Sequence, residues 1–165
     1  MGKDAALRRS VGAARRPCLQ LRMKPKKSWR EKLATSKDLP KTMVIPAPLE
    51  VDALMKQVPR GRVVTINELR AALAAKHQVT FACPLTTGIF SWIAAHAAAE
   101  AEAAGAKRIT PFWRTLKTGG EINPKYPGGA EAVASRLRTE GHKIVAKGKR
   151  TFVADHEKKL FTKLR

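Results

Sequence analysis

The sequence predicts a mainly α-helical domain with a small β-hairpin near its C-terminal end. Four stretches place apolar residues at the three- and four-residue spacing of an amphipathic helix, and two short strand-like runs around a Lys-Gly turn follow the last of them. Aromatic residues make up only 5% of the chain, so helices rich in Ala and Leu must supply much of the packing. Helices followed by a basic hairpin are typical of a winged helix-turn-helix, and we expect that fold with disordered basic arms on both sides.

The chain divides into three predicted segments. Residues 1–42 carry many Lys and Arg with little periodicity, and we expect them to form a basic, disordered N-terminal arm. Residues 43–153 carry the periodic apolar pattern and form the ordered domain. Residues 154–165 form a basic C-terminal tail.

The first two predicted helices are separated by a turn. The first helix carries its inward residues on one face: Val51, Leu54, Met55 and Val58. Pro59-Arg60-Gly61 should end it, because Pro and Gly favour turns. Thr65 and Glu68 then form a capping box, in which each side chain satisfies a free N–H group at the other residue's position. This pair begins a second helix over residues 66–76. The inward residues of the second helix are Ile66, Leu69 and Leu73.

The third predicted helix is long and rich in alanine. Thr86 or Thr87 should cap it, and it should end near Gly105, where a C-terminal Gly is expected. Its apolar stripe consists of Ile89, Phe90, Ile93 and Ala97. The remaining alanines keep its surface slim, which favours close approach to another backbone or to a groove wall. Glu100 and Glu102 make its far end acidic, so that end is a poor contact for DNA.

A fourth helix and the hairpin complete the domain. A turn-rich stretch around Pro111 and a loop over residues 123–129 precede them. The helix is predicted by the spacing of its apolar residues: Ala130, Val133, Ala134 and Leu137. Gly141 should close it. Ile144-Val145 and Thr151-Phe152-Val153 then form the two arms of the hairpin, with three basic residues at its tip: Lys147, Lys149 and Arg150.

The charge of the chain favours a polyanionic partner. Lys and Arg number 33 against 13 Asp and Glu, which gives a net charge of +20 and an isoelectric point near 10.8. Half of this surplus lies in residues 1–42. A surplus of this size is typical of proteins that bind nucleic acid or an anionic membrane surface.

Several other function classes are disfavoured by the pattern. No apolar run approaches the roughly 18–20 residues needed to span a bilayer, and the basic N-terminus lacks the apolar stretch of a secretory signal. The two cysteines, Cys18 and Cys83, have neither a metal-binding spacing nor a partner set for a disulfide framework. The four histidines also lack a metal-binding spacing, so we expect an intracellular protein without a bound metal.

Several motifs resemble the DNA-binding domain of the O6-alkylguanine-DNA alkyltransferases. Residues 58–69, Val-Pro-Arg-Gly-Arg-Val-Val-Thr-Ile-Asn-Glu-Leu, are similar to the V-P-x-G-x-V-x-T/S-Y-x-x-L segment of that family. Thr110-Pro111-Phe112-Trp113-Arg114 stands where the family has P-C-H-R. Gly119-Gly120, Tyr126-Pro127-Gly128-Gly129 and a helix ending in Glu140-Gly141 follow in the family's order. The resemblance covers residues 46–142, and several motifs recurring in order make it fairly specific.

This resemblance implies a fold but not the family's reaction. In the family, a winged helix-turn-helix binds duplex DNA through the minor groove and flips the damaged guanine, and the motif Cys, activated by its His neighbour, accepts the alkyl group. Phe112 stands at the Cys position and Trp113 at the His position. A phenyl ring has no lone pair to offer and an indole cannot relay a proton as imidazole does, so alkyl transfer at this position is excluded.

The chain is similar in this respect to the alkyltransferase-like proteins. Those proteins lack the Cys, bind alkylated DNA and are thought to hand lesions to other repair proteins; they usually read P-W-H-R, so this chain also departs from them at the His. The family's Tyr after the capping Thr is Ile66 here, and the third helix offers no Arg or Lys before Lys107 to fill a vacated base stack. The resemblance therefore implies DNA binding more directly than base flipping.

Together, charge and resemblance predict a non-enzymatic protein without a cofactor. We expect a monomer that binds duplex DNA, with DNA-repair proteins as further partners and no membrane association, in the cytoplasm at the nucleoid. The candidate DNA-binding residues are Arg60, Arg62, Thr65, Thr87, Ser91, Trp92, Lys147, Lys149 and Arg150. The candidates for lining a lesion pocket are Phe112, Trp113, Arg114 and Tyr126. The rings of this second set would stack on an extruded base or, alternatively, fill the space left by the lost active site.

Two rival functions stay open from the sequence. One is residual methyltransferase activity through another thiol, for which Cys83 is the candidate. The other is a degenerate scaffold whose basic arms bind nucleic acid in general, such as RNA.

Overall fold

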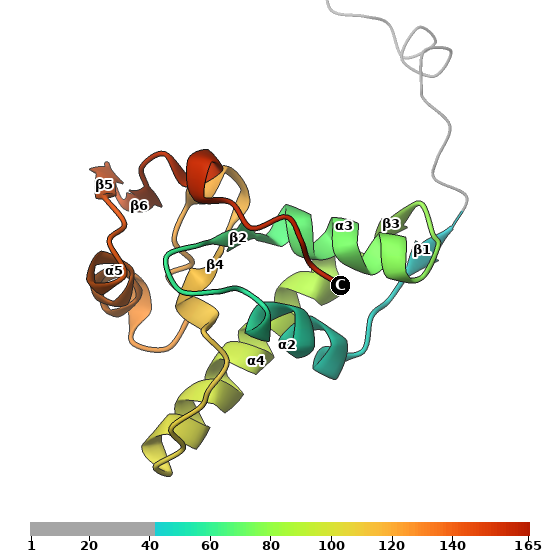
Figure 1. Cartoon of the computed structure of the whole chain (residues 1–165), viewed down its shortest axis with the longest axis horizontal. Coiled ribbons are helices and arrows are strands. Elements are labelled where there is room, and N and C mark those ends of the chain that lie inside the picture. The colour runs from blue at the N-terminus through green and yellow to red at the C-terminus, as the bar shows by residue number, and fades with distance from the viewer. Residues whose placement is uncertain (1–41) are drawn as a thin grey trace, which may run out of the picture. The chain divides into compact units, whose positions relative to one another are not determined.

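The computed structural model describes residues 42–165, so the predicted N-terminal arm lies outside the described residues. Within this range the chain forms four α-helices: α2 (Pro48–Lys56), α3 (Ile66–Lys76), α4 (Pro84–Ala103) and α5 (Gly129–Thr139) (Figure 1). Three two-stranded sheets accompany them. Strands β1 (Met43–Val44) and β3 (Phe81–Ala82) pair in parallel, as do β2 (Val64–Thr65) and β4 (Thr115–Leu116). Strands β5 (Ile144–Lys147) and β6 (Arg150–Val153) form an antiparallel hairpin. The fold is thus mainly α with small sheets.

The core lies where α2, α3 and α4 pack against one another and continues toward α5. The predicted inward residues of the first helix are all buried, and α3 has the predicted bounds with Leu69 and Leu73 fully buried. Its capping box is present: the Thr65 amide donates to the Glu68 carboxylate at 3.0 Å, and the Asn67 amide donates to the Thr65 hydroxyl at 3.3 Å. The β2–β4 ladder therefore leads directly into a well-anchored α3.

Helix α4 departs from the prediction at its start. Its N-cap is Cys83 rather than Thr86 or Thr87, because Pro84 takes the first helical position, where its missing N–H costs nothing. The Thr87 hydroxyl instead donates back to the Cys83 carbonyl at 2.8 Å. The predicted end holds, since Gly105 adopts φ +90° just beyond the helix.

The predicted apolar stripe of α4 is wrong except at Phe90, which is partly buried against the core. The buried face consists of small residues: Thr87, Ser91, Ala94, Ala95 and Ala98. Ile89 and Ile93 are 44% and 41% exposed, and Ala97 is exposed as well. Helix α2 packs against α4, and small side chains allow this close approach, so the bulky residues are turned outward. The C-terminal half of α4 extends away from the other helices (Figure 1).

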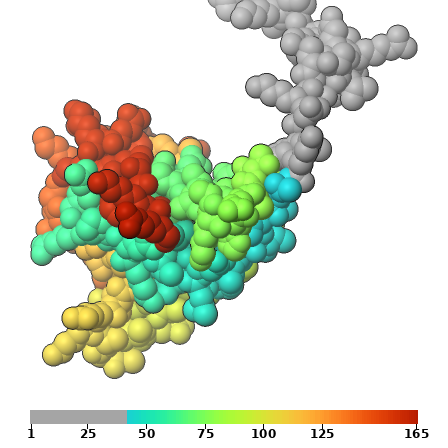
Figure 2. All heavy atoms as spheres, turned by 45° about the vertical axis from the view of Figure 1, so that its right-hand side comes forward, coloured from blue at the N-terminus to red at the C-terminus, as the bar shows by residue number. Residues whose placement is uncertain are grey.

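The C-terminal tail is ordered, contrary to the expected disordered arm. A 3₁₀ turn (His156–Lys159) leads into a segment that pairs with the chain before α3, where the Phe161 amide donates to the Val63 carbonyl at 2.7 Å. The Gln57 side chain holds both the amide and the carbonyl of Arg165, at 2.9 and 2.7 Å. Figure 2 shows this segment, in red, lying across the green part of the chain. Phe161 and Leu164 pack on the core, so the apolar residues among the basic ones hold the tail in place.

Candidate nucleic-acid interface

A cavity of about 530 Å³ opens between the start of α4 and the loop that follows β4. Its lining residues are Ile66, Pro84, Gly88, Ser91, Leu116, Lys117, Thr118, Glu121, Asn123, Pro124, Lys125 and Tyr126. A Cβ atom added at Gly88 would meet no other atom within 4 Å, so this glycine leaves open space beside the helix. The cavity therefore exists partly because α4 carries no side chain at this position.

Two buried polar side chains stand in the wall of this cavity. The Ser91 hydroxyl donates to the Gly88 carbonyl at 2.9 Å, within α4. Burial raises the pKa of the Tyr126 phenol above its ordinary value, although hydrogen bonding with Ser91 and Asn123 acts in the opposite direction. Tyr126 is consequently a neutral hydroxyl group that can donate or accept a hydrogen bond.

A second hollow, of about 640 Å³, adjoins the cavity and is more apolar. It shares Pro84, Gly88, Asn123 and Lys125 with the cavity and adds three exposed side chains of α4: Leu85, Ile89 and Trp92. The Trp92 indole donates to the Lys125 carbonyl at 3.0 Å, which fixes the ring against the loop. The two hollows together form a groove along the N-terminal half of α4.

The basic hairpin is attached to the wall of the cavity. The Ile122 amide donates to the Thr151 carbonyl at 2.8 Å, and Glu121 forms an isolated bridge with Phe152. The hairpin turn at Gly148 has φ +60°, a conformation that favours glycine. As predicted, Lys147, Lys149 and Arg150 surround this turn and are exposed. Of the three hairpin charges, Arg150 approaches the cavity wall, with its guanidinium 3.9 Å from Glu121, whereas Lys147 lines a separate hollow with Phe152.

The four predicted pocket residues do not line one cavity. Phe112 is only 1% exposed and lies between Trp113 and Tyr126, with ring centroids 5.4 and 6.0 Å away, both in edge-to-face geometry. Tyr126 lines the cavity beside α4, whereas Trp113 and Arg114 line a separate hollow of about 270 Å³. Phe112 itself is a core residue, in keeping with the space-filling interpretation of this position.

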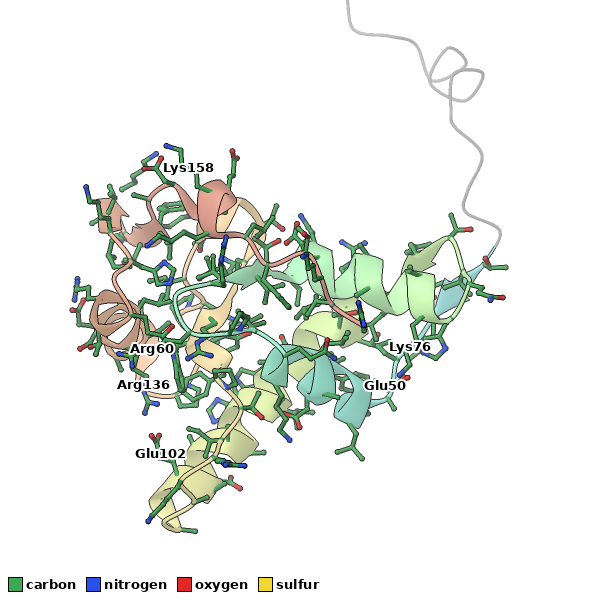
Figure 3. The ribbon with its side chains drawn as sticks, viewed as in Figure 1. Glu50, Arg60, Lys76, Glu102, Arg136 and Lys158 are labelled. Atoms are coloured by element: carbon green, nitrogen blue, oxygen red, sulfur yellow. The ribbon has the colours of Figure 1, made fainter. Side chains whose placement is uncertain are left out.

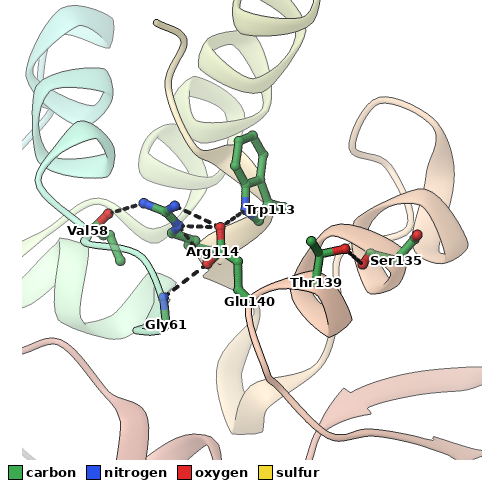
Figure 4. A network of polar contacts seen from close by, with 7 residues as sticks. All are labelled: Val58, Gly61, Trp113, Arg114, Ser135, Thr139 and Glu140. Carbon is green, nitrogen blue, oxygen red and sulfur yellow. Dashed lines mark hydrogen bonds and ion pairs between the residues drawn. The ribbon is translucent and has the colours of Figure 1, made fainter.

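Arg114 is held by the Glu140 carboxylate, which the sequence pattern indicates only as part of a helix end. Glu140 accepts hydrogen bonds from the Trp113 indole at 2.8 Å, from Arg114 Nη2 at 2.7 Å and from the Gly61 amide at 3.2 Å (Figure 4). Arg114 Nη1 also donates to the Val58 carbonyl at 2.6 Å. Burial acts to raise the pKa of Glu140, but these donors outweigh it and hold the pKa below its ordinary value. The Trp-Arg pair therefore acts as a brace between η1 (Phe112–Arg114), α5 and the turn before β2.

The predicted DNA-binding residues fall into three groups. Thr65, Thr87 and Ser91 are buried, and their hydroxyls make hydrogen bonds within the fold. Trp92 is exposed in the groove, and the three hairpin residues are exposed around the hairpin turn. Arg62 donates to the Lys158 carbonyl at 3.3 Å, and Arg60 lines the same hollow as Trp113.

Other kinds of site receive no support from the described residues. Within residues 42–165, no group of three or more His, Cys, Asp or Glu side chains is arranged to hold a metal ion. No helix in that range is long and apolar enough to cross a membrane. Cys83, at the N-terminus of α4, is half-buried, and hydrogen bonds from the backbone and side chain of Thr86 lower the pKa of its thiol.

Comparison with known proteins gives a structural similarity only. No protein-family model and no curated protein matches the sequence. The chain is similar to Atl1 of S. pombe in complex with damaged DNA containing O6-carboxymethylguanine, with 15% identity and a TM-score of 0.48. It is also similar to S. pombe ATL in complex with DNA, with 15% identity and a TM-score of 0.49. Each match covers 69% of this chain and 93% of the solved one.

Proposed function

We propose that this protein is a non-enzymatic DNA-binding protein of the alkyltransferase-like kind. In this proposal α3, α4 and the β5–β6 hairpin act as a winged helix-turn-helix on duplex DNA. Helix α4 and the groove beside it face the duplex, and the hairpin serves as the wing.

The observation that carries the proposal is the groove beside α4, whose lining includes the basic residues Lys117 and Lys125. The cavity of about 530 Å³ lies within the range of small-molecule sites, roughly 300–1,000 Å³. Its wall combines apolar surface with the hydroxyls of Ser91 and Tyr126, which is the mixture that reads an extruded base. Extrusion of an alkylated base into this cavity is the finer part of the proposal.

Electrostatics supports the same partner. Residues 43–165 alone contain 20 Lys and Arg against 10 Asp and Glu, so the surplus does not depend on the N-terminal arm. Lys149 makes no ion pair within the described residues, and Arg150 lies 3.9 Å from Glu121, the limit of an ion pair. Exposed cations of this kind neutralise phosphates and release counterions.

Chemistry at the motif supports a binding role rather than catalysis. The buried ring of Phe112 offers no nucleophile, and the Trp113 indole is committed to Glu140. A protein with this motif holds a damaged base without altering it.

The test is a salt-dependent binding titration with duplex DNA, with and without one O6-methylguanine. We expect the logarithm of the binding constant to fall linearly with that of salt concentration, by roughly 0.9 per phosphate neutralised. Replacing Lys147, Lys149 and Arg150 by Gln should lower this slope by about 2–3. The control replaces three exposed lysines away from the hairpin by Gln: Lys56, Lys76 and Lys107. Equal losses in both triple variants, or tighter binding of structured RNA than of duplex DNA, would contradict the proposal.

The cavity has its own test in Gly88→Leu. The added side chain has open space before it, so the variant should fold and fill the groove. We expect it to abolish any preference for the modified duplex while leaving the salt dependence in place. An unchanged preference would show that the cavity does not receive the base.

A further inference from the structure

The hollow of about 270 Å³ beside Trp113 is independent of the groove along α4. Its lining residues are Arg60, Trp113, Arg114, Arg136, Thr139 and Glu140. It shares none of them with the cavity or the apolar hollow, and the buried Phe112 ring stands between Trp113 and the Tyr126 side of the cavity. A ligand here would not compete directly for the groove.

One face of α5 builds half of this hollow. Arg136, Thr139 and Glu140 follow one another at i, i+3 and i+4, so their side chains lie on the same side of the helix. Glu140 has its charge balanced by Arg114 and also accepts a hydrogen bond from the Gly61 amide. That last bond ties the turn carrying Arg60 to the hollow.

Two arginines in this hollow keep donors free for a ligand. The Arg136 guanidinium lies 4.7 Å from the centroid of the Trp113 ring and 5.5 Å from that of Phe112, which orients it. Its Nη2 atom pairs with Glu102 at 2.6 Å, in a contact that is partly open to solvent (Figure 3). Arg60 is exposed and forms no hydrogen bond or ion pair with any residue between 42 and 165. Arg60 and Arg136 thus line one small hollow in which the Glu140 carboxylate is paired with Arg114 and Glu102 competes for Arg136.

We propose that this hollow binds a phosphate group between Arg60 and Arg136. Guanidinium groups donate two parallel hydrogen bonds to phosphate oxygens, and paired arginines are a common phosphate site. The Thr139 hydroxyl, which already donates to the Ser135 carbonyl at 3.1 Å, stands at the rim. The phosphate comes from a free phosphate or mononucleotide, or from a nucleic-acid backbone, and the chemistry of recognition is the same.

The Glu102–Arg136 ion pair allows a variant that should strengthen phosphate binding rather than weaken it. Glu102 occupies one edge of the guanidinium that the phosphate would use, so it acts as an internal competitor. Glu102→Gln removes that negative charge and should tighten phosphate binding. Arg60→Gln and Arg136→Gln should each weaken it about tenfold, since each removes a charge-assisted hydrogen-bond donor.

The experiment follows the NMR signal of the Trp113 indole N–H in the full chain, at constant ionic strength held with chloride. Inorganic phosphate, deoxyguanosine monophosphate and a short unmodified duplex are titrated separately. We expect a saturable shift with phosphate or the mononucleotide, weakened by Arg60→Gln and Arg136→Gln and strengthened by Glu102→Gln. If only the duplex shifts the signal, the site binds a backbone phosphate. Loss of that duplex-induced shift in the Arg60→Gln variant would confirm this assignment.

Arg138→Gln is the matched control, because Arg138 lies on the same helix, carries the same charge and pairs with Glu131 outside the hollow. The proposal is overturned if none of the three probes gives a saturable shift, or if Arg138→Gln weakens binding as much as Arg136→Gln does. Because inorganic phosphate needs no DNA-binding surface, these outcomes are separate from those that test the proposed function.

Discussion

Arg114 and Glu140 form a salt bridge in which the guanidinium Nη2 lies 2.7 Å from one carboxylate oxygen and Nε lies 3.0 Å from both oxygens. Both side chains are largely withdrawn from water, with 14% of Arg114 and 7% of Glu140 exposed. The pair joins η1 to the end of α5, and through Val58 and Gly61 it reaches the turn before β2. It therefore connects the Phe112–Arg114 turn to the segment between α2 and α3.

Breaking this pair should destabilise the domain strongly. Glu140→Gln keeps the shape but leaves Arg114 without its counter-charge, and removing one partner of a buried ion pair costs about 3–5 kcal/mol. The measurement is urea unfolding followed by far-ultraviolet circular dichroism. The control is Glu131→Gln, which loses only an exposed partner and should cost less than about 0.5 kcal/mol. Similar losses in the two variants would show that the pair does not brace the fold.

His142 should make stability depend on pH. The side chain is buried, and neither ring nitrogen has a hydrogen-bond partner among the described residues. Burial lowers its pKa below 6.5, as do the charges of Lys159 and Arg114, against an opposing effect of Glu140. The unfolded chain therefore takes up a proton at a higher pH than the folded chain does. Stability is full above pH 6.5 and falls as the pH drops below that value.

The measurement compares urea unfolding between pH 8 and pH 5 for the protein and for His142→Leu. The variant should show a flatter dependence over this range, because its side chain takes up no proton. Carboxylates whose pKa is lowered in the folded chain, such as Glu140, stabilise the fold above the unfolded value of 4.5 and lose that contribution only as the pH falls below it, so they affect a different range. An unchanged slope in His142→Leu would assign the effect to another group.

Gly88→Ala should stabilise the protein. The residue lies inside α4, its backbone suits any amino acid, and an added Cβ atom meets nothing within 4 Å. Alanine favours a helix interior over glycine by about 1 kcal/mol, which thermal unfolding would detect. Gly128→Ala is the contrasting variant, because φ is +77° there and the new Cβ atom would lie 2.5 Å from Ala132. A loss of stability in Gly88→Ala would mean that this part of α4 is not the open surface described above.

The C-terminal segment should contribute measurably to stability. Phe161→Ala removes a ring that packs on the core beside Val63, and we expect a loss of about 1–2 kcal/mol for this partly buried side chain. Lys163→Ala, at an exposed position in the same segment, should be close to neutral. Chemical denaturation of both variants checks the difference, and equal midpoints would mean that the segment detaches in solution.

Cys83 should be more reactive than an ordinary cysteine without accepting a methyl group from DNA. Hydrogen bonds from Thr86 lower the pKa of its thiol, so in a Cys18→Ser background its alkylation by iodoacetamide should begin at lower pH than in the additional variant Thr86→Ala. Incubation with O6-methylguanine duplex and intact mass measurement checks the second part. A mass gain of one methyl group that is lost in Cys83→Ser would replace the proposed binding role by an enzymatic one.

The elements that follow from local signals could be predicted from the sequence. The bounds of α3 depend on Thr65 and Glu68, which lie within one helical turn: the Glu68 carboxylate accepts from the Thr65 amide and the Thr65 hydroxyl accepts from the Asn67 amide, without help from the rest of the chain. The hairpin follows from a Lys-Gly turn and two short runs, and the structure extends both predicted arms by pairing Lys147 with Arg150. Such signals survive in any tertiary context.

The misplaced features depend on packing between distant segments. The apolar pattern of α4 cannot reveal that α2 approaches its alanine face, so the stripe of Ile89 and Ile93 was assigned to the wrong side. Likewise, the role of Glu140 depends on partners 79 residues away at Gly61 and 27 residues away at Trp113. The prediction of a single pocket was wrong for the same reason, because the buried Phe112 ring separates Trp113 from Tyr126.

The exposed large apolar side chains of α4 affect how the protein behaves in concentrated solution. Each molecule exposes an apolar surface that favours contact with the same surface of another copy; it consists of Leu85, Ile89, Trp92 and Ile93. The net charge of +20 opposes this through mutual repulsion, which added electrolyte weakens. Purification at high ionic strength, the usual way to strip nucleic acid from a basic protein, should therefore promote self-association, and dilute electrolyte should keep the molecules apart.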